Sequence, residues 1–380
     1  MSTTHWISDR ITLRRAPGLR LSLIVAGVII ALALIDVSLE RTEQGELAAQ
    51  ALRAEQSGTQ LLKQRQANEA VDAFRKAHAL ERENTRYEID LIQALMAAGK
   101  LAEAQPLMSD LLEEQSNDGE TNLVAARLAA RQAHVSLADA YYHRAIYGQW
   151  PDELSEHQVE VRLELINFLQ AHGKQDEILA ELLPLQEQAQ KDSNLLPKVA
   201  LLFLAAGSPG RAETIFRQLI KIEPENGGNY SGLGEAELAL GDFRAAHTAF
   251  ENAEAHGENG PALGKRLQLA SMLSNLDPTP RWLSAQNKYA RSMRILGLAT
   301  GDLQQCITNH SERSTDAANQ LLAGAQTELS APVPKQPTNE VAEGALSLAA
   351  SIWHTRTSVC GTGTSSDEEP LRLIMEKLAK

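Results

Sequence analysis

The stretch LGEAELALGDFRAAHTAFENA, residues 233–253, contains two helical patterns of small and apolar residues on either side of Gly241. Its second half places Ala246, Phe250 and Ala253 four and three positions apart, the spacing at which side chains share one face of a helix. A glycine between two such patterns is typical of a turn that ends a helix with a positive φ angle. The stretch therefore predicts two helices joined by a short turn.

The same triplet recurs along the chain at intervals of 34 residues, with one six-residue slip between the third and fourth copies. The copies are Ala70/Phe74/Ala77, Ala104/Met108/Leu111, Ala138/Tyr142/Ala145, Ile178/Leu182/Leu185, Ala212/Phe216/Leu219 and Ala246/Phe250/Ala253. A period of this length indicates repeated helix pairs that bury their apolar faces against one another. We expect six copies over residues 51–260, at 51–84, 85–118, 119–152, 159–192, 193–226 and 227–260.

Small residues on the first helix of two copies complete a known signature. Gly58 and Gly234 each precede the alanine of the second helix by twelve positions. Together with MAAGKLAEA (96–104) and GRAETIFRQLIKIEP (210–224), these residues make the chain resemble the tetratricopeptide repeat (TPR) superfamily. The resemblance implies a right-handed α-solenoid of helix-turn-helix repeats. Gly58 and Gly234 are expected to face Ala70 and Ala246, where they let the paired backbones approach closely.

Two copies depart from this pattern. The third has Arg131-Gln132-Ala133 where the turn glycine is expected, and the fourth has Ile178 in place of the small residue of the second helix. Between them lies a longer connection that contains Trp150. We expect this indole to pack over a neighbouring helix, and a contact with a partner is the alternative.

The composition supports an all-α protein. Hydrophobic residues make up 43% of the 380 residues and aromatic residues only 4%, and apolar content that is mostly Ala and Leu suits closely packed helices. The net charge of −13 indicates no nucleic-acid partner, and it favours solubility or a basic or amphipathic partner. We expect no metal, cofactor or small-molecule substrate, because no metal-binding histidine pair and no catalytic motif can be assembled from the sequence.

The N-terminal region predicts a single membrane anchor. Residues 19–39 are apolar except for Arg20 and Asp36, and their number matches the roughly 20 residues that cross a bilayer. Arginines precede the segment and glutamates follow it, which places residues 1–18 in the cytoplasm as a tail. Residues 40–50 would form a stalk that leads into the first repeat. In a bacterium, the anchor would lie in the inner membrane and the repeats in the periplasm; the alternative is a signal peptide cleaved after the small-residue motif at 31–33.

The TPR resemblance implies that first helices line a concave face that binds partners. The residues it places there are Arg86, Ile89, Gln93, Met96, Arg127, Asn167, Gln170 and Glu235. An extended or helical peptide of another protein is the expected occupant, and an ordinary solvated helix face is the alternative for each position. The clamp with which some relatives hold an acidic C-terminal tail needs Lys and Asn, but this chain has Glu55 and Thr59 there. That ligand is therefore disfavoured.

The remainder of the chain is also predicted to be helical. Residues 261–300 are expected to form capping helices or a degenerate repeat, and residues 301–380 a helical extension with a proline-rich linker at 331–339. The extension either folds back on the repeats or remains mobile. Its two cysteines, Cys306 and Cys360, would form a disulfide in an oxidising compartment, and otherwise they remain free buried thiols.

These patterns predict a membrane-anchored, non-catalytic scaffold that binds protein or peptide partners. The processes that it would serve are cell-envelope assembly, secretion or polysaccharide export. The alternative is a chaperone-like or regulatory subunit of a membrane enzyme complex. An enzyme in its own right would need a site in the residues after Gly301.

Overall fold

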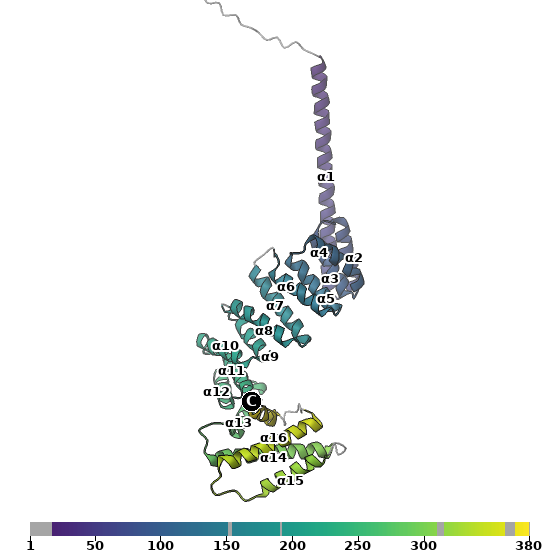
Figure 1. Cartoon of the computed structure of the whole chain (residues 1–380). Helices are drawn as coiled ribbons and strands as arrows, with labels where there is room; N and C mark the ends of the chain where they lie inside the picture. Colours follow the sequence, from purple (N-terminus) through teal and green to yellow (C-terminus); the bar gives the residue numbers. More distant parts are fainter. Residues whose placement is uncertain (1–16, 151–153, 191, 310–314, 362–368, 380) are drawn as a thin grey trace, which may run out of the picture. The chain divides into compact units, whose positions relative to one another are not determined.

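The amphipathic spacing of the repeats takes the form of successive packed helices in a computed structural model of the chain (Figure 1). The structure describes residues 17–150, 154–190, 192–309, 315–361 and 369–379. Within these ranges every regular element is a helix, which confirms the all-α prediction.

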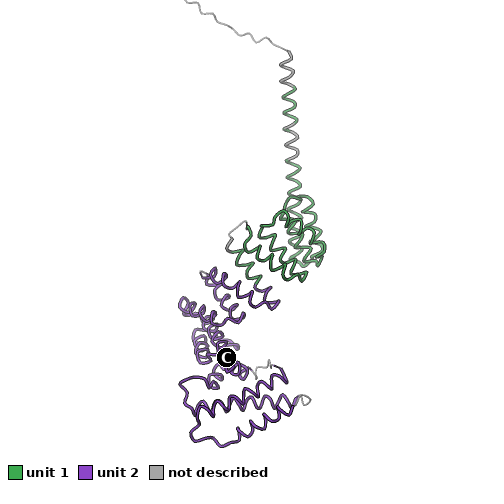
Figure 2. Tube along the Cα trace, viewed as in Figure 1, with its two compact units in different colours: residues 1–165 green, residues 166–380 purple. Residues whose placement is uncertain are grey.

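The chain divides into two compact units, residues 1–165 and 166–380 (Figure 2). The helices of the first unit are α1 (Pro17–Lys63), α2 (Ala67–Leu80), α3 (Thr85–Ala97), α4 (Leu101–Glu114), α5 (Gly119–Arg131) and α6 (Val135–Tyr147). The boundary between the units falls within α7 (Leu154–Ala171). The helices of the second unit are α8 (Gln175–Ala189), α9 (Leu195–Ala205), α10 (Pro209–Ile222), α11 (Gly227–Leu240), α12 (Phe243–Ala255), α13 (Pro261–Leu276), α14 (Ala285–Asn309), α15 (Asp316–Ser330), α16 (Asn339–Cys360) and α17 (Glu369–Leu378).

The first helix, α1, is continuous over 47 residues. It therefore includes the predicted stalk and the first helix of the first repeat without a break. The predicted cytoplasmic tail lies outside the described residues, apart from its last two positions. Among the residues whose structure is described, no helix has both the length and the apolar character that crossing a membrane requires.

The glycines of the repeat signature make room for an aromatic ring. A Cβ atom added at Gly58 would lie 2.8 Å from the ring of Phe74, and one added at Gly234 would lie 2.6 Å from the ring of Phe250. The ring one turn beyond Ala70 or Ala246 is thus the nearest neighbour of each glycine, and it fills the space that the missing side chain leaves. Phe74 and Phe250 are buried, so each small residue and its ring form one packing unit.

The turn without glycine has the same conformation as the turns that contain one. Ala133 adopts a φ angle of 60°, and Gly99 a φ angle of 74°. The backbone amide of His134 donates to the carbonyl of Ala129 at 2.9 Å, as the amide of Lys100 does to that of Leu95 at 2.9 Å. Alanine in the left-handed region costs roughly 1–2 kcal/mol. The third copy therefore keeps the geometry of the turn at some expense in stability.

Trp150 packs within the first unit, as the sequence predicts. Its indole nitrogen donates to the carbonyl of Ala145 at 3.0 Å, and its ring stacks on His157 with centroids 4.2 Å apart. A Cβ atom at Gly119 would lie only 2.2 Å from this ring. The start of α5 therefore depends on a glycine that lets the indole approach.

In the second unit, α11 to α17 contribute to one apolar core. Its buried members include Leu238, Phe250, Leu273, Leu303, Leu322, Ile352 and Ile374, one from each of these helices in turn. The C-terminal extension thus folds onto the helices that follow the repeats. Helix α16 packs against α14 (Figure 1). Helix α17 packs against α13 and α14.

The predicted boundary between residues 300 and 301 is wrong, because α14 continues through it as one helix. A single glycine in a helix costs only about 1 kcal/mol, whereas Leu296, Ala299, Leu303 and Cys306 lie on one buried face across this point. The free energy gained by burying that face therefore exceeds the cost of the glycine.

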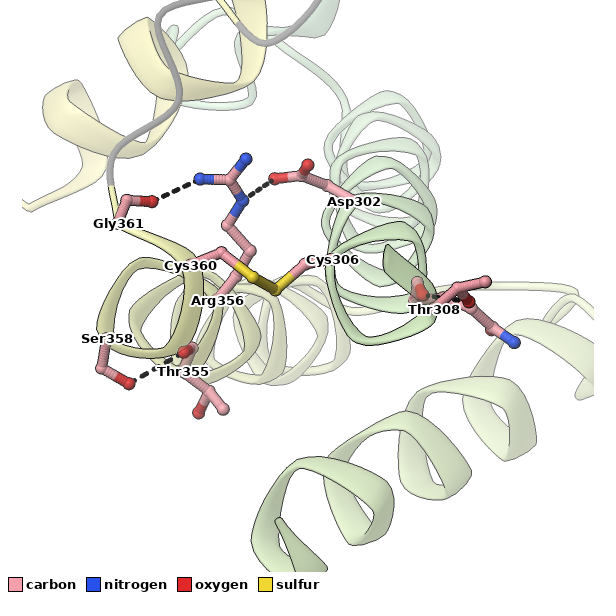
Figure 3. Close-up of a disulfide and its surroundings, with 9 residues drawn as sticks. Asp302, Cys306, Thr308, Thr355, Arg356, Ser358, Cys360 and Gly361 are labelled. Atoms are coloured by element: carbon pink, nitrogen blue, oxygen red, sulfur yellow. Dashed lines mark hydrogen bonds and ion pairs between the residues drawn. A yellow bond between two sulfur atoms is a disulfide. The ribbon is translucent and has the colours of Figure 1, made fainter. Parts of the chain in front are cut away.

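Cys306 of α14 and Cys360 at the end of α16 form a disulfide (Figure 3). Beside it, the buried guanidinium of Arg356 pairs with Asp302 at 2.8 Å and donates to the carbonyl of Gly361. The disulfide and this ion pair both join α16 to α14. The start of the segment that leads to α17 is therefore held close to α14.

Candidate protein-binding surfaces

The predicted contact residues on α3 have different environments. Arg86 is exposed and lies 3.5 Å from the carboxylate of Asp90 and 3.7 Å from that of Glu120, while Gln93 is half-buried. Ile89 and Met96, however, are only 3% and 5% exposed and belong to the core of the first unit. Their assignment to a partner-binding face is wrong, because α3 packs against four helices, α1, α2, α4 and α5, which leave it only a narrow outer face.

Arg127, the predicted contact residue on α5, is held inside the first unit by two bonds to one carboxylate. Its Nε and Nη2 atoms donate to Glu164 at 2.8 and 2.7 Å, and the Tyr142 hydroxyl donates to the same group at 2.9 Å. Burial raises the pKa of the Glu164 carboxyl, but the hydrogen bonds and charge of Arg127 outweigh that effect and hold the pKa below its ordinary value. This cluster is internally satisfied, and it stabilises the packing of α5, α6 and α7.

Three predicted contact residues lie in the second unit. Asn167 and Gln170 are exposed on α7. Glu235 on α11 pairs with Arg266 on α13 at 2.8 Å, and Arg266 also pairs with Glu369 at the start of α17 at 3.0 Å. Burial raises the pKa of the Glu235 carboxyl in spite of the attraction of Arg266. Glu235 is therefore linked to the C-terminal extension only through Arg266.

A groove of about 750 Å³, which the sequence did not indicate, lies on the second unit. Its lining residues come from the second helices α10 and α12 and from the first helix α11 between them. They are Arg217, Ile220, Lys221, Tyr230, Leu233, Glu237, Asp242, Arg244, Ala245, Thr248, Ala249 and Asn252. The groove is thus formed mainly by second helices, whereas the TPR resemblance drew attention to first helices. The spacing of Arg217 and Lys221 by four positions, on one helix face, is the sequence signal that could have pointed to it.

The groove combines apolar and charged surfaces. Leu233 and Ala249 are buried and Tyr230 is half-buried, its ring stacked on His256 with centroids 4.9 Å apart. Three basic side chains, Arg217, Lys221 and Arg244, are exposed around it. Basic residues thus outnumber the two acidic residues of the lining, although the whole chain carries a net charge of −13.

Glu237 is the buried carboxylate of this groove, with 3% of its surface exposed. One of its oxygens accepts a hydrogen bond from Arg217 at 2.7 Å, and the other has no hydrogen-bond partner. Burial raises the pKa of this carboxyl to about 7, because it outweighs the attraction of Arg217, and the nearby Asp242 and Glu213 add to the shift. The oxygen without a partner is itself buried, so it belongs to the wall of the groove and not to its accessible surface.

Within the described ranges, no group of three or more His, Cys, Asp or Glu side chains is arranged to hold a metal ion. The polar clusters found there are ion pairs and hydrogen bonds between neighbouring helices.

Comparison with known families gives one match. The tetratricopeptide repeat model matches residues 61–128, from the end of α1 into α5. This part of the chain carries tetratricopeptide repeats. No curated protein matches the sequence.

The following three are among the solved structures whose helices are arranged in a similar way. The chain is similar to YrrB, a TPR protein with an unusual peptide-binding site, at 15% identity and a TM-score of 0.38, covering 52% of this chain and 98% of that one. It is similar to PilF of Pseudomonas aeruginosa at 16% identity and a TM-score of 0.31, covering 50% and 82%. The C-terminal part of a TPR repeat-containing protein from Cytophaga hutchinsonii is 10% identical, with a TM-score of 0.41 and coverage of 83% and 98%. At these scores the likenesses carry no argument about function.

Proposed function

We propose that this protein is a non-catalytic scaffold that binds a segment of a partner protein in the groove between α10 and α12. The observation that carries the proposal is the groove itself, which combines a partly exposed tyrosine with an exposed basic rim. Binding sites in proteins commonly pair apolar surface with a few polar groups that fix orientation.

The groove favours an amphipathic segment with acidic side chains. An apolar side chain of such a segment would pack on Tyr230 and Leu233, while its carboxylates would face Lys221 and Arg244. Complementary charge of this kind contributes to specificity and to the rate of association.

A photo-crosslinking amino acid at Thr248 tests this proposal. Thr248 is exposed and lines the groove, whereas Thr214 is an exposed threonine of α10 outside it and provides the matched control. We expect a defined protein to crosslink in cells from position 248 and not from position 214. The crosslink should disappear in the double variant Lys221→Glu/Arg244→Glu. Equal crosslinking from both positions, or crosslinking that survives the charge reversal, would contradict the proposed site.

We also propose that residues 19–39 anchor the chain in a membrane, with the repeats on the non-cytoplasmic side, where they would serve the cell envelope. Support comes from the apolar run in the sequence and from the arginines that precede it. The side chains of Val25, Ile29 and Leu32 are at least half exposed along α1. The disulfide between Cys306 and Cys360 suits an oxidising compartment.

Alkaline extraction of membranes, together with protease protection of the repeats in sealed spheroplasts, tests the anchor. We expect the full chain to stay with the membrane and to be digested from outside. A chain released by alkali, or one protected from external protease, would contradict the proposal.

A further inference from the structure

The C-terminal helix α17 covers part of the surface that α11, α13 and α14 form at the end of the second unit. Leu371, Ile374 and Met375 are each no more than 5% exposed, and their spacing of three and four positions places them on one helix face. These three side chains enter the core shared by α11 to α16. The opposite side of α17 includes the exposed Glu376, so α17 binds this surface as an amphipathic helix.

The end of α17 is fixed by a lysine. The Nζ atom of Lys377 donates to the carbonyl of Gly241 at 2.8 Å and to the carboxylate of Asp277 at 2.6 Å, and it lies 5.0 Å from the centroid of the Phe243 ring. Gly241 and Asp277 cap the C-terminal ends of α11 and α13. A cation is favoured at such helix ends, because the backbone carbonyls there carry partial negative charge.

The start of α17 is held by the carboxylate of Glu369. Glu369 pairs with Arg266 at 3.0 Å, and Arg266 pairs in turn with Glu235 at 2.8 Å. Glu235 is a residue that the TPR resemblance assigned to partner binding. Helix α17 therefore lies against α13 and α14 and reaches Glu235 of α11 only through Arg266.

The carboxylate that receives Lys377 is also held by a neighbouring residue. The second oxygen of Asp277, Oδ1, accepts hydrogen bonds from the backbone amide and the hydroxyl of Thr279, at 3.0 and 2.8 Å. The surface also continues beyond the helix: a cavity of about 480 Å³ beside Lys377 is lined in part by Trp282, which is 65% exposed. A helix longer than α17 would find further contacts there.

We propose that this surface is a helix-recognition site that α17 occupies within its own chain, and that an amphipathic helix of a partner protein binds there by displacing α17. The partner helix would carry an acidic residue near its start, apolar residues at the spacing of Leu371, Ile374 and Met375, and a lysine near its end. The cavity beside Lys377 shares Asp242 and Arg244 with the groove between α10 and α12, but the contacts of α17 itself are made to Arg266, Gly241 and Asp277, and the proposal does not depend on the function proposed for that groove.

A labelled peptide of residues 369–379 tests the proposal on the full-length protein. Fluorescence anisotropy would measure its binding to the wild type and to Ile374→Asp, a change that removes the central apolar contact of α17 and leaves the receiving surface intact. A tethered helix competes at an effective concentration on the order of 1 mM, so a peptide with a Kd near 10 µM should bind the wild type roughly 100-fold more weakly than the variant. Glu376→Gln, on the exposed side of α17, should behave as the wild type.

Other results distinguish a partner helix at this surface from a second copy of the chain and from α17 as a permanent part of the core. A peptide with Lys377→Ala should lose at least tenfold in affinity for the Ile374→Asp protein. Equal binding to wild type and variant, absence of binding to both, or dimerisation of the variant in place of peptide binding would overturn the proposal. Loss of protection from hydrogen exchange in α13 and α14, in Ile374→Asp and in the milder Lys377→Ala alike, would also overturn it, because α17 would then be part of the core.

Discussion

Two glutamates, one in each unit, pair with arginine, yet their carboxyl pKa values shift in opposite directions. In the first unit, Glu164 accepts two hydrogen bonds from Arg127 and one from Tyr142, and its pKa is lowered. In the second unit, Glu237 accepts one hydrogen bond from Arg217, and burial raises its pKa to about 7. The opposite signs follow from the donors around each carboxylate set against its burial, and at Glu237 the negative charges of Asp242 and Glu213 add to the upward shift.

The same difference separates a structural cluster from a candidate binding region. Both carboxylate oxygens of Glu164 already accept hydrogen bonds from Arg127 or Tyr142. This cluster therefore offers little to a partner. Glu237 keeps one buried oxygen without a hydrogen-bond partner in the wall of a groove with a basic rim. An unmet hydrogen-bonding group in a buried position costs stability, so the second unit carries a cost at this groove that the first unit avoids at Glu164.

The largest expected effect comes from the ring that packs α12 against α11 in the groove region. Phe250→Ala should lower the free energy of unfolding by about 3–5 kcal/mol, because the buried ring fills the space left by Gly234. Chemical denaturation measures this, with Thr214→Ala on the exposed side of α10 as the control. A loss below about 1 kcal/mol would mean that the ring is not part of the core.

The two glutamates should respond oppositely to pH. The folded Glu237 carboxyl keeps its proton up to about pH 7, but the unfolded one releases it near its ordinary value of 4.5. The contribution of this group to the free energy of unfolding therefore falls as the pH rises between these values. Glu237→Gln should remove that fall and stabilise the protein at pH 8 by about 1–3 kcal/mol.

Glu164→Gln is the matched control for this pH dependence. The lowered pKa of Glu164 contributes stability that is present above its ordinary value of 4.5 and is lost as the pH falls. The variant should therefore be destabilised at pH 8 and less so at pH 4. If both glutamine variants shifted the stability in the same direction at pH 8, the contrast between the two sites would be refuted.

A smaller effect is expected from the hydroxyl that helps to satisfy Glu164. Tyr142→Phe should lower the free energy of unfolding by about 1 kcal/mol, because it removes one hydrogen bond to a partly buried carboxylate. Tyr147→Phe, at a side chain that is 69% exposed, is the control. Equal melting temperatures for the two variants would show that the hydroxyl does not contribute.

The smallest effect concerns the turns. Ala133→Gly should raise the free energy of unfolding by roughly 0.5–1 kcal/mol, since it relieves a left-handed alanine, and Gly99→Ala should lower it by a similar amount. No neighbouring atom lies within 4 Å of a Cβ added at Gly99, so backbone conformation alone is tested there. Two variants that change stability in the same direction would contradict the shared turn geometry.

Much of the fold could be predicted from the sequence, because the period of 34 residues and the apolar spacing are local signals. The regular elements described after residue 260 are also helices, as the sequence indicates. The long helix α14 was missed because a glycine and polar residues suggested a break, whereas its continuity depends on contacts with α16 from a distant part of the chain. The sequence pattern alone could not show that contact.

The candidate site was less predictable. The TPR resemblance assigned Ile89 and Met96 to the concave partner-binding face, although the helices packed around α3 bury both side chains. The groove of the second unit brings Arg217, Glu237 and Arg244 together from three helices. Such a juxtaposition depends on how neighbouring repeats pack, and a periodic pattern does not specify it.

The central claim is that a partner segment binds between α10 and α12, and hydrogen–deuterium exchange tests it most directly. The full chain would be compared with the complex captured through Thr248. We predict slower exchange in residues 209–222 and 243–255 of the complex, which are the helices that form the groove. Slower exchange confined to the first helices α3, α5 and α7, with no change in those two segments, would contradict the account.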